Sequence, residues 1–340
     1  MSLSNFTRLG VLLAGGLLLA HCASPQSVVP SLGNSSGGIA RAPSTLRPSH
    51  RESWMAKGIN QRDLLYVSNA NGTVNVYTYW QHNLVGVLTN FTQPLGECAD
   101  QASNVYIVDY QKAKISEYAH GGTKPLKVLD DSPNSPTDCA VSPPSGNVAV
   151  ANSAYDRYTK GNIAIYPRGT GTPKIYYGNA YNDHFNGVAY DDRGDLLTTS
   201  TFSYLNWYTE FYYLPSHGSQ LILMNLPPPQ GSGWDFVQDV GWDGKYWLVL
   251  SSNTIYRYTI NVKAKMVDSI KLYGGSYDIS AMALYRKSSK SFATQVAGPN
   301  GTASKASVEY WHYPSGGSPY ATITKGLDQP GGIAISLRTQ

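Results

Sequence analysis

The chain has 340 residues, and only 14% of them are charged, well below the roughly 25% typical of soluble domains. It also contains 26 Tyr, 33 Gly and 20 Pro residues. This composition excludes a coiled coil, a highly charged disordered chain and a long helical bundle. It favours a turn-rich, all-β extracellular protein.

The net charge of +4 comes from the N-terminal part of the chain. Residues 1–60 contain five basic residues and one acidic residue, whereas residues 61–340 contain 21 of each. A neutral domain has no basic footprint for phosphates, so we expect no nucleic acid among its partners.

The N-terminus has the pattern of a signal sequence, residues 1–22. Arg8 is the only charge before an apolar run of 12 residues, 9–20, which is too short to span a bilayer. The letters Leu19-Ala20-His21-Cys22 resemble a bacterial lipobox, which implies lipidation of Cys22. Simple cleavage near Ala23 is the alternative. We therefore expect export to a periplasmic, outer-membrane-anchored or extracellular place, with membrane contact only through that anchor.

Residues 23–60 are rich in Ser, Gly and Pro and have no apolar periodicity, so they are predicted to be a disordered tether. Residues 61–340 form the predicted folded domain. From residue 63 a pattern of short strands repeats. One strand of each repeat has an aliphatic second residue and, with one exception at Met224, an aromatic fifth residue. We assign these as third strands, at 73–77, 114–118, 162–166, 220–224, 254–258 and 307–311.

Each third strand follows another β-prone run, at 63–67, 104–108, 147–151, 195–199, 245–249 and 291–295. Short apolar runs closed by tight turns come before these. One position in each run corresponds from repeat to repeat, and these positions are spaced by 41, 48, 52, 42 and 51 residues. They are Cys98, Cys139, Gly187, Asp239, Ala281 and Gly332. A period of about 40–50 residues with four strands per repeat is typical of a β-propeller.

The ends of the domain complete each other. The first repeat lacks an inner strand, and residues 331–336 form an inner strand with no repeat after it. Pairing of the two would close the ring and remove its free edges. The predicted fold is therefore an all-β, six-bladed β-propeller closed by its C-terminal strand, with seven blades or a β-sandwich as alternatives.

The repeats resemble those of a known group. The letters N-V-Y-I-V-D at 104–109 and I-x-x-Y at 115–118 resemble NHL-repeat propellers, and the similarity covers about 63–336. This architecture hosts lactonases, lyases, sensors and scaffolds, so it implies a fold more than a function.

The repeat register also predicts a ring of residues at one mouth of the central channel. These residues precede the equivalent positions by one, and four of the six carry oxygen atoms that hard cations prefer. They are Glu97, Asp138, Asn186, Gln238, Ser280 and Gly331. Asn186-Gly187-Val188-Ala189 resembles the N-G-[IL]-A motif of gluconolactonase-type propellers, in which Glu, Asn and Asp hold a divalent metal. The resemblance implies Ca²⁺ or another divalent metal on Glu97, Asp138 and Asn186. The alternative is that these side chains simply solvate a water-filled channel.

An aromatic stretch in the fourth repeat, 202–213, is predicted as a long loop on the same face. We expect its aromatic side chains, together with the nearby histidine, to bind a ligand by stacking. The candidates are Tyr204, Trp207, Tyr208, Phe211, Tyr212 and His184. A hairpin that caps the blade is the alternative for the stretch, and an exposed loop position is the alternative for His184.

Cys98 and Cys139 occupy the same register in adjacent repeats, so a disulfide between them is predicted, with two free thiols as the alternative. Standard catalytic motifs are mostly missing. We therefore expect a monomeric binding module for a glycan, a peptide or an envelope protein. A metal-dependent lactonase-like hydrolase and a purely structural envelope protein are the alternatives.

Overall fold

The computed structural model describes residues 52–154, 159–179, 183–202, 208–229, 234, 237–261, 263–274, 279–288, 291–300 and 306–338. All of them belong to one compact unit, Leu46–Gln340. Within this part of the chain the helical segments are two short 3-10 turns, η1 (Ile59–Gln61) and η2 (Pro167–Gly169), and the rest of the regular structure is β. Over the same residues, no helix is long and apolar enough to cross a membrane.

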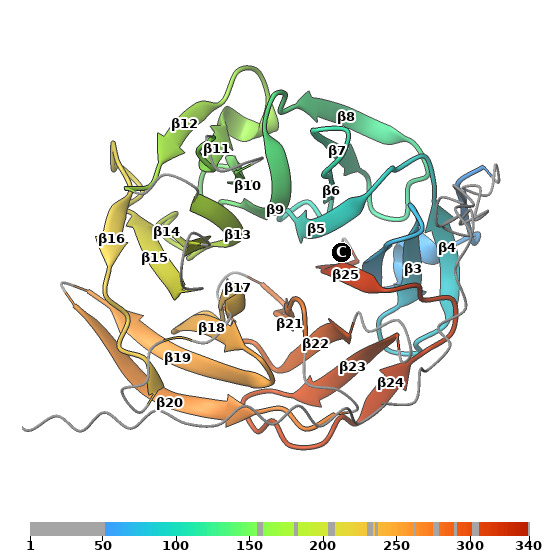
Figure 1. Ribbon diagram of the computed structural model, residues 1–340. Coiled ribbons are helices and arrows are strands. Elements are labelled where there is room, and N and C mark those ends of the chain that lie inside the picture. The colour runs from blue at the N-terminus through green and yellow to red at the C-terminus, as the bar shows by residue number, and fades with distance from the viewer. Residues whose placement is uncertain are drawn as a thin grey trace, which may run out of the picture. The chain divides into compact units, whose positions relative to one another are not determined.

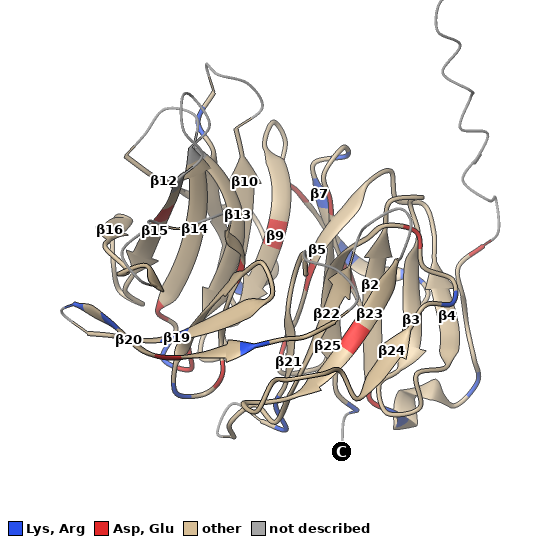
Figure 2. Cartoon of the chain, turned by 60° about the horizontal axis from the view of Figure 1, so that its bottom comes forward, with Lys and Arg blue, Asp and Glu red and all other residues tan. Residues whose placement is uncertain are grey.

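Antiparallel sheets follow one another around a common centre, and the inner strand of each lies nearest that centre (Figure 1). Charged residues lie mostly in turns and at strand ends (Figure 2). The predicted all-β propeller arrangement is thus confirmed.

The first sheet contains both the first and the last strands of the domain. Its order is β1 (Trp54–Met55), β4 (Leu84–Leu88), β3 (Val74–Thr78), β2 (Leu64–Asn69) and β25 (Pro330–Ser336). Strand β25 pairs with β2 from Leu64↔Ser336 to Asn69↔Pro330, which confirms the predicted closure.

The folded chain begins earlier than predicted. Strand β1 pairs with β4 through Trp54↔Val87 and Met55↔Gly86, and Ile59 of η1 is buried. These residues lie within the predicted tether 23–60, so its C-terminal boundary is wrong. A two-residue strand carries no detectable apolar period, which explains the error.

Three further sheets have four strands each in simple chain order. They comprise β5 (Pro94–Ala99), β6 (Val105–Asp109), β7 (Lys114–Tyr118) and β8 (Pro125–Asp130); β17 (Val237–Trp242), β18 (Trp247–Ser251), β19 (Thr254–Ile260) and β20 (Ala264–Lys271); and β21 (Ala283–Tyr285), β22 (Gln295–Asn300), β23 (Ser307–His312) and β24 (Ala321–Ile323).

The remaining sheet has eight strands. It comprises β9 (Ser135–Val141), β10 (Val148–Ser153), β11 (Asn162–Tyr166), β12 (Lys174–Tyr177), β13 (Asp183–Tyr190), β14 (Leu196–Phe202), β15 (Tyr208–Leu214) and β16 (Ile222–Met224). Over the described residues, the two halves pair in register at one position, Ser153↔His184, between β10 and β13.

Two predicted strands are wrong. The third strand of the fourth repeat is β15, and the segment predicted for that role, 220–224, contains the outer strand β16. In the last repeat, the second strand is β22 at Gln295–Asn300 rather than 291–295. In both cases a local five-residue pattern matched a neighbouring segment of similar composition.

The hydrophobic core lies between neighbouring sheets. The aromatic residues predicted at third-strand ends are all buried there. Most of them donate a hydrogen bond from their hydroxyl or indole N–H to a backbone carbonyl. Tyr77 donates to Lys325 O at 2.8 Å, and Trp311 Nε1 donates to Tyr273 O at 3.0 Å. Because both faces of a propeller sheet are covered, most second-strand positions are apolar and buried on both sides.

Candidate functional site

The predicted aromatic loop is largely a hairpin. Tyr204 and Trp207 lie outside the described residues, and Tyr208 begins strand β15. Phe211 and Tyr212 are 2% and 0% exposed, so the prediction that they contact a ligand is wrong. Phe211 packs against Trp234 with ring centroids 5.2 Å apart, whereas Tyr212 packs near Phe185 on the opposite side of the sheet. Neighbouring sheets cover both faces of β15, so these two successive residues are both buried. In a loop they would have been exposed.

His184 lies on strand β13 next to β10. Its Nδ1 atom is 2.7 Å from Ser153 Oγ, across the residue pair that joins the two halves of the eight-stranded sheet. Burial lowers the pKa of this histidine. The ring therefore contributes to a strand junction, and its role as a ligand contact stays a prediction.

The channel contains a small cavity of about 80 Å³ between the inner strands. Its lining residues are Gly96, Glu97, Asp138, Cys139, Val188, Asp239, Val240, Ala281, Met282, Gly332 and Ile333. Of the three predicted metal ligands, Glu97 and Asp138 therefore line one cavity and Asn186 does not. Asn186 lies at a β-bulge between Phe185 and Gly187, and its Nδ2 donates to Thr201 Oγ1 at 2.9 Å.

The sequence register missed Asp239 for the same reason. A bulge between Val237 and Asp239 brings Asp239 to the cavity, and the Gln238 side chain instead accepts the backbone N–H of Ser252 at 2.7 Å. One extra residue in a bulge reverses which side chain faces the centre. A register copied from one repeat to the next therefore cannot identify the lining residues.

The three carboxylates each bond to a neighbouring strand. Glu97 Oε1 accepts from Ser68 Oγ at 2.6 Å, and Asp138 Oδ2 accepts from Val188 N at 3.0 Å. Asp239 accepts two backbone N–H groups, from Val240 at 2.7 Å and from Met282 at 2.8 Å. Strands therefore approach closely here, and a Cβ on Gly96 would lie 2.4 Å from Asp138 Oδ1.

Burial shifts these groups toward their protonated forms. It raises the pKa of Glu97 to about 8 and that of Asp138 to about 7. Burial raises the pKa of Asp239 well above its usual range, and the negative charge of Asp138 raises it further. At neutral pH the channel therefore favours carboxyl groups that retain protons.

The channel does not fit a divalent metal. Over the described residues, no group of three or more His, Cys, Asp or Glu side chains is placed to hold one. Four of the six lining carboxylate oxygens already accept bonds from the wall. The predicted third ligand, Asn186, bonds elsewhere. The metal-dependent hydrolase accordingly remains a prediction from the resemblance alone.

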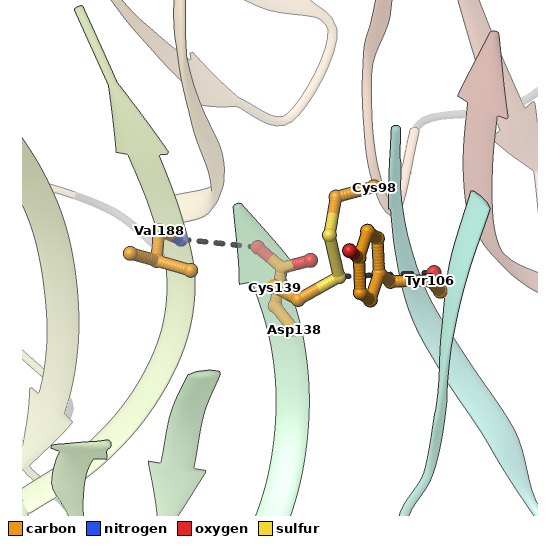
Figure 3. The surroundings of a disulfide bond; sticks show 5 residues. All are labelled: Cys98, Tyr106, Asp138, Cys139 and Val188. Carbon is orange, nitrogen blue, oxygen red and sulfur yellow. Dashed lines mark hydrogen bonds between the residues drawn. A yellow bond between two sulfur atoms is a disulfide. The ribbon is translucent and has the colours of Figure 1, made fainter. Parts of the chain in front are cut away.

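A disulfide lies beside this cavity (Figure 3). Cys98 on β5 and Cys139 on β9 are bonded, with Cα atoms 5.6 Å apart. Consecutive residues of β9 point in opposite directions: Asp138 bonds to Val188 on β13, and Cys139 bonds to Cys98 on β5. Strand β9 is therefore held to an inner strand on each side, by a covalent bond and by a hydrogen bond.

A larger depression, which we call the central pocket, lies where inner strands turn into second strands. Its volume is about 700 Å³. Apolar and charged side chains both line it: Ala99, Asp100, Gln101, Ala102, Ser103, Val141, Ser142, Pro143, Gly146, Asp192, Leu284, Arg286, Lys287, Ser288, Ile335, Leu337 and Arg338. This turn face is opposite to the face on which the sequence placed the ligand.

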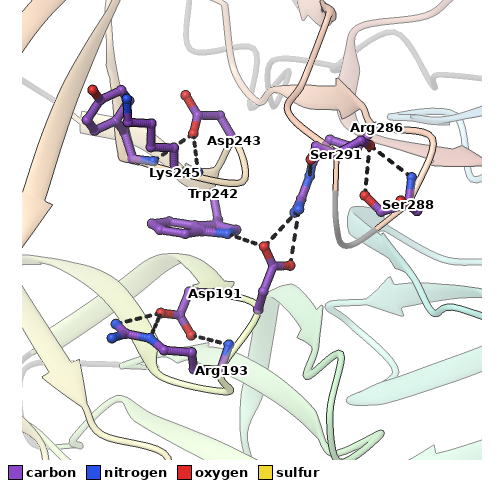
Figure 4. A network of polar contacts seen from close by, with 10 residues as sticks. Asp191, Arg193, Trp242, Asp243, Lys245, Arg286, Ser288 and Ser291 are labelled. Atoms are coloured by element: carbon purple, nitrogen blue, oxygen red, sulfur yellow. Dashed lines mark hydrogen bonds and ion pairs between the residues drawn. The ribbon is translucent and has the colours of Figure 1, made fainter.

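A polar junction forms one wall of the central pocket (Figure 4). Arg286 Nη2 donates to both oxygens of Asp192, at 2.8 and 3.1 Å, and Trp242 Nε1 donates to the same carboxylate at 2.8 Å. Arg286 Nε also donates to Ser291 O at 2.9 Å. Asp192 and Arg286 lie just after β13 and β21, and Trp242 ends β17. They are 50 and 44 positions apart in the chain, so no local motif pointed to them.

A second depression of about 700 Å³, which we call the side pocket, adjoins the central pocket. The two share Lys287, Leu337 and Arg338. The other lining residues of the side pocket are Gln61, Arg62, Asp63, Trp80, Gln81 and Tyr285.

Comparison with known proteins supports the fold and leaves the function open. No protein-family model matches the chain, and no curated protein matches its sequence. Among solved structures, 1148 chains match, so the fold is too widely used to specify an activity. One of them, from the crystal structure of a nidogen/laminin complex, has a TM-score of 0.61 at 14% identity and covers 82% of this chain and 100% of its own. Fold and comparison together define the chain as a β-propeller.

Proposed function

We propose that the protein is an exported, monomeric β-propeller that binds a protein partner at the central pocket. The observation that carries this proposal is the contrast between two volumes. The central pocket on the turn face measures about 700 Å³, and the cavity in the channel measures about 80 Å³. Such a pocket admits side chains of a partner, whereas the cavity in the channel is roughly a ninth of its volume.

Two further observations support a protein partner. The wall of the pocket is held by the Arg286–Asp192–Trp242 junction, so the shape is fixed before a partner arrives. The similar solved structure belongs to a protein–protein complex by its title, which is consistent with this use of the fold.

We also propose that the propeller has six blades. The eight-stranded sheet divides into two four-stranded repeats, β9–β12 and β13–β16, because among the described residues Ser153↔His184 is the only pair in strand register between them. With the first sheet and the three four-stranded sheets, this division gives six repeats around the centre.

Site-specific photocrosslinking tests the binding face. A photoreactive amino acid at Gln101, which is exposed in the central pocket, should crosslink a protein from the secreted and envelope fractions of the source cells. The same residue at Tyr177, 55% exposed on the outer strand β12, is the control and should give no such product. Equal crosslinking at both positions, or none at Gln101, would remove the proposal.

A further inference from the structure

The side pocket has a strong local excess of positive charge. Three basic residues line it, Arg62, Lys287 and Arg338, against one acidic residue, Asp63. All three basic residues are exposed, and none forms an ion pair with a described residue. Because residues 61–340 carry equal numbers of basic and acidic residues, this excess is a local arrangement and not a consequence of net charge.

Asp63 offsets one of the three positive charges, so a net excess of two remains, and both of its oxygens accept hydrogen bonds from neutral groups. Oδ2 accepts from Trp80 Nε1 at 3.0 Å and from the Tyr285 hydroxyl at 2.9 Å. Oδ1 accepts from the backbone N–H of Arg338 at 2.9 Å. The aspartate therefore acts as a positioning residue that fixes the chain at Arg338 and orients the half-exposed Trp80.

The central pocket adds an apolar surface next to these charges. Val141, Leu284, Ile335 and Leu337 line it and all keep part of their surface exposed. Leu337 and Lys287 belong to both pockets, so apolar and cationic surfaces are continuous. A ligand that covers both must carry an apolar group within a few residues of negative charge.

We propose that the two pockets together bind an acidic segment of a protein chain. An apolar side chain of the segment enters the central pocket, and neighbouring carboxylates pair with Arg62, Lys287 and Arg338. An acidic polysaccharide would satisfy the cations and stack on Trp80, but it has no apolar side chain for the central pocket. This inference rests on the proposed function, because both place the partner in the central pocket.

A random ten-residue peptide library displayed on phage, selected on the purified full-length protein, tests the chemistry. Enriched peptides should combine Asp or Glu with Leu, Ile or Phe, and their affinity should fall as salt concentration rises. The double variant Lys287→Glu/Arg338→Glu should weaken an enriched peptide at least tenfold. The control Lys263→Glu/Lys265→Glu, with the same change of charge at the start of the outer strand β20, should change it less than twofold.

A pocket-filling variant separates this inference from the proposed function. Ala102→Trp, at an exposed turn position of the central pocket, should also weaken peptide binding. Suppose that Ala102→Trp removes peptide binding, but the enriched peptides are not acidic and charge reversal does not weaken them. This result would overturn the inference, while the proposed binding face would stand. Enrichment of no peptide, together with charge-dependent binding of oligogalacturonate, would overturn it in favour of a polysaccharide. Failure of the Gln101 crosslink would instead remove the proposed function.

Discussion

Carboxylate side chains have different roles in the channel and on the turn face. In the channel, Glu97, Asp138 and Asp239 form no ion pair with a described residue, bond to backbone or hydroxyl groups, and have raised pKa values. On the turn face, Asp192 is paired with Arg286 and sits at the wall of an open pocket. The difference teaches that carboxylates in this propeller hold strands together at the centre and shape the wall of an open pocket on the turn face.

The largest expected effect comes from the disulfide that fastens the channel wall. Replacing both cysteines, Cys98→Ser with Cys139→Ser, releases a loop of 41 residues. The loop-entropy relation gives a loss of about 4 kcal/mol in the free energy of unfolding, measured by urea denaturation. A loss below about 1 kcal/mol would show that the other contacts of β9 already restrain the chain.

A matched pair of aspartates compares the two regions directly. Asp239→Ala removes the carboxylate acceptor of a buried backbone N–H at Val240 and of a partly buried one at Met282, and should cost about 3 kcal/mol. Asp192→Ala breaks an ion pair that solvent reaches and should cost about 1 kcal/mol. Equal losses in urea denaturation would contradict the contrast between interior and surface carboxylates.

The raised pKa values predict how stability depends on pH. Glu97, with its pKa raised to about 8, binds a proton in the folded state at pH values where the unfolded chain has lost it. Stability should therefore fall between about pH 5 and pH 8, by at most about 1.4 kcal/mol per pH unit for each such group. Glu97→Gln should reduce this slope by the contribution of one group, at most about 1.4 kcal/mol per pH unit. An unchanged slope in the variant, by chemical denaturation at several pH values, would show that Glu97 does not titrate here.

The smallest effect on stability is expected at the side pocket. Lys287→Glu with Arg338→Glu should change the free energy of unfolding by less than about 0.5 kcal/mol, because both side chains are exposed and unpaired with described acids. Thermal melting checks this directly. A large loss would mean that these residues hold the ring closure, and the side pocket would then be a structural junction.

Sequence alone predicted the ring closure and most third strands, because both depend on local alternation and on buried aromatic ends such as Tyr118 and Tyr166. It failed at Phe211 and Tyr212. Their aromatic-rich stretch does not match the five-residue pattern of the other third strands, yet it forms a buried strand. It also failed at Asn186 and Asp239, because bulges shift side chains by one residue. The Arg286–Asp192–Trp242 junction joins three distant turns, and only the fold brings them together.

The pairing of β25 with β2 has a consequence for how the chain reaches its native state. Leu64 and Ser336 are partners separated by almost the whole domain, so the first sheet lacks its inner edge until the last residues have been made. Such non-local pairing raises contact order and slows folding. The Arg338 N–H lies 2.9 Å from the Asp63 carboxylate, so the end of β25 lies beside the start of β2. A circular permutant that links residue 338 to residue 63 would turn this late, long-range step into the closing of a local hairpin, although it would detach β1 and the buried Ile59 from β2.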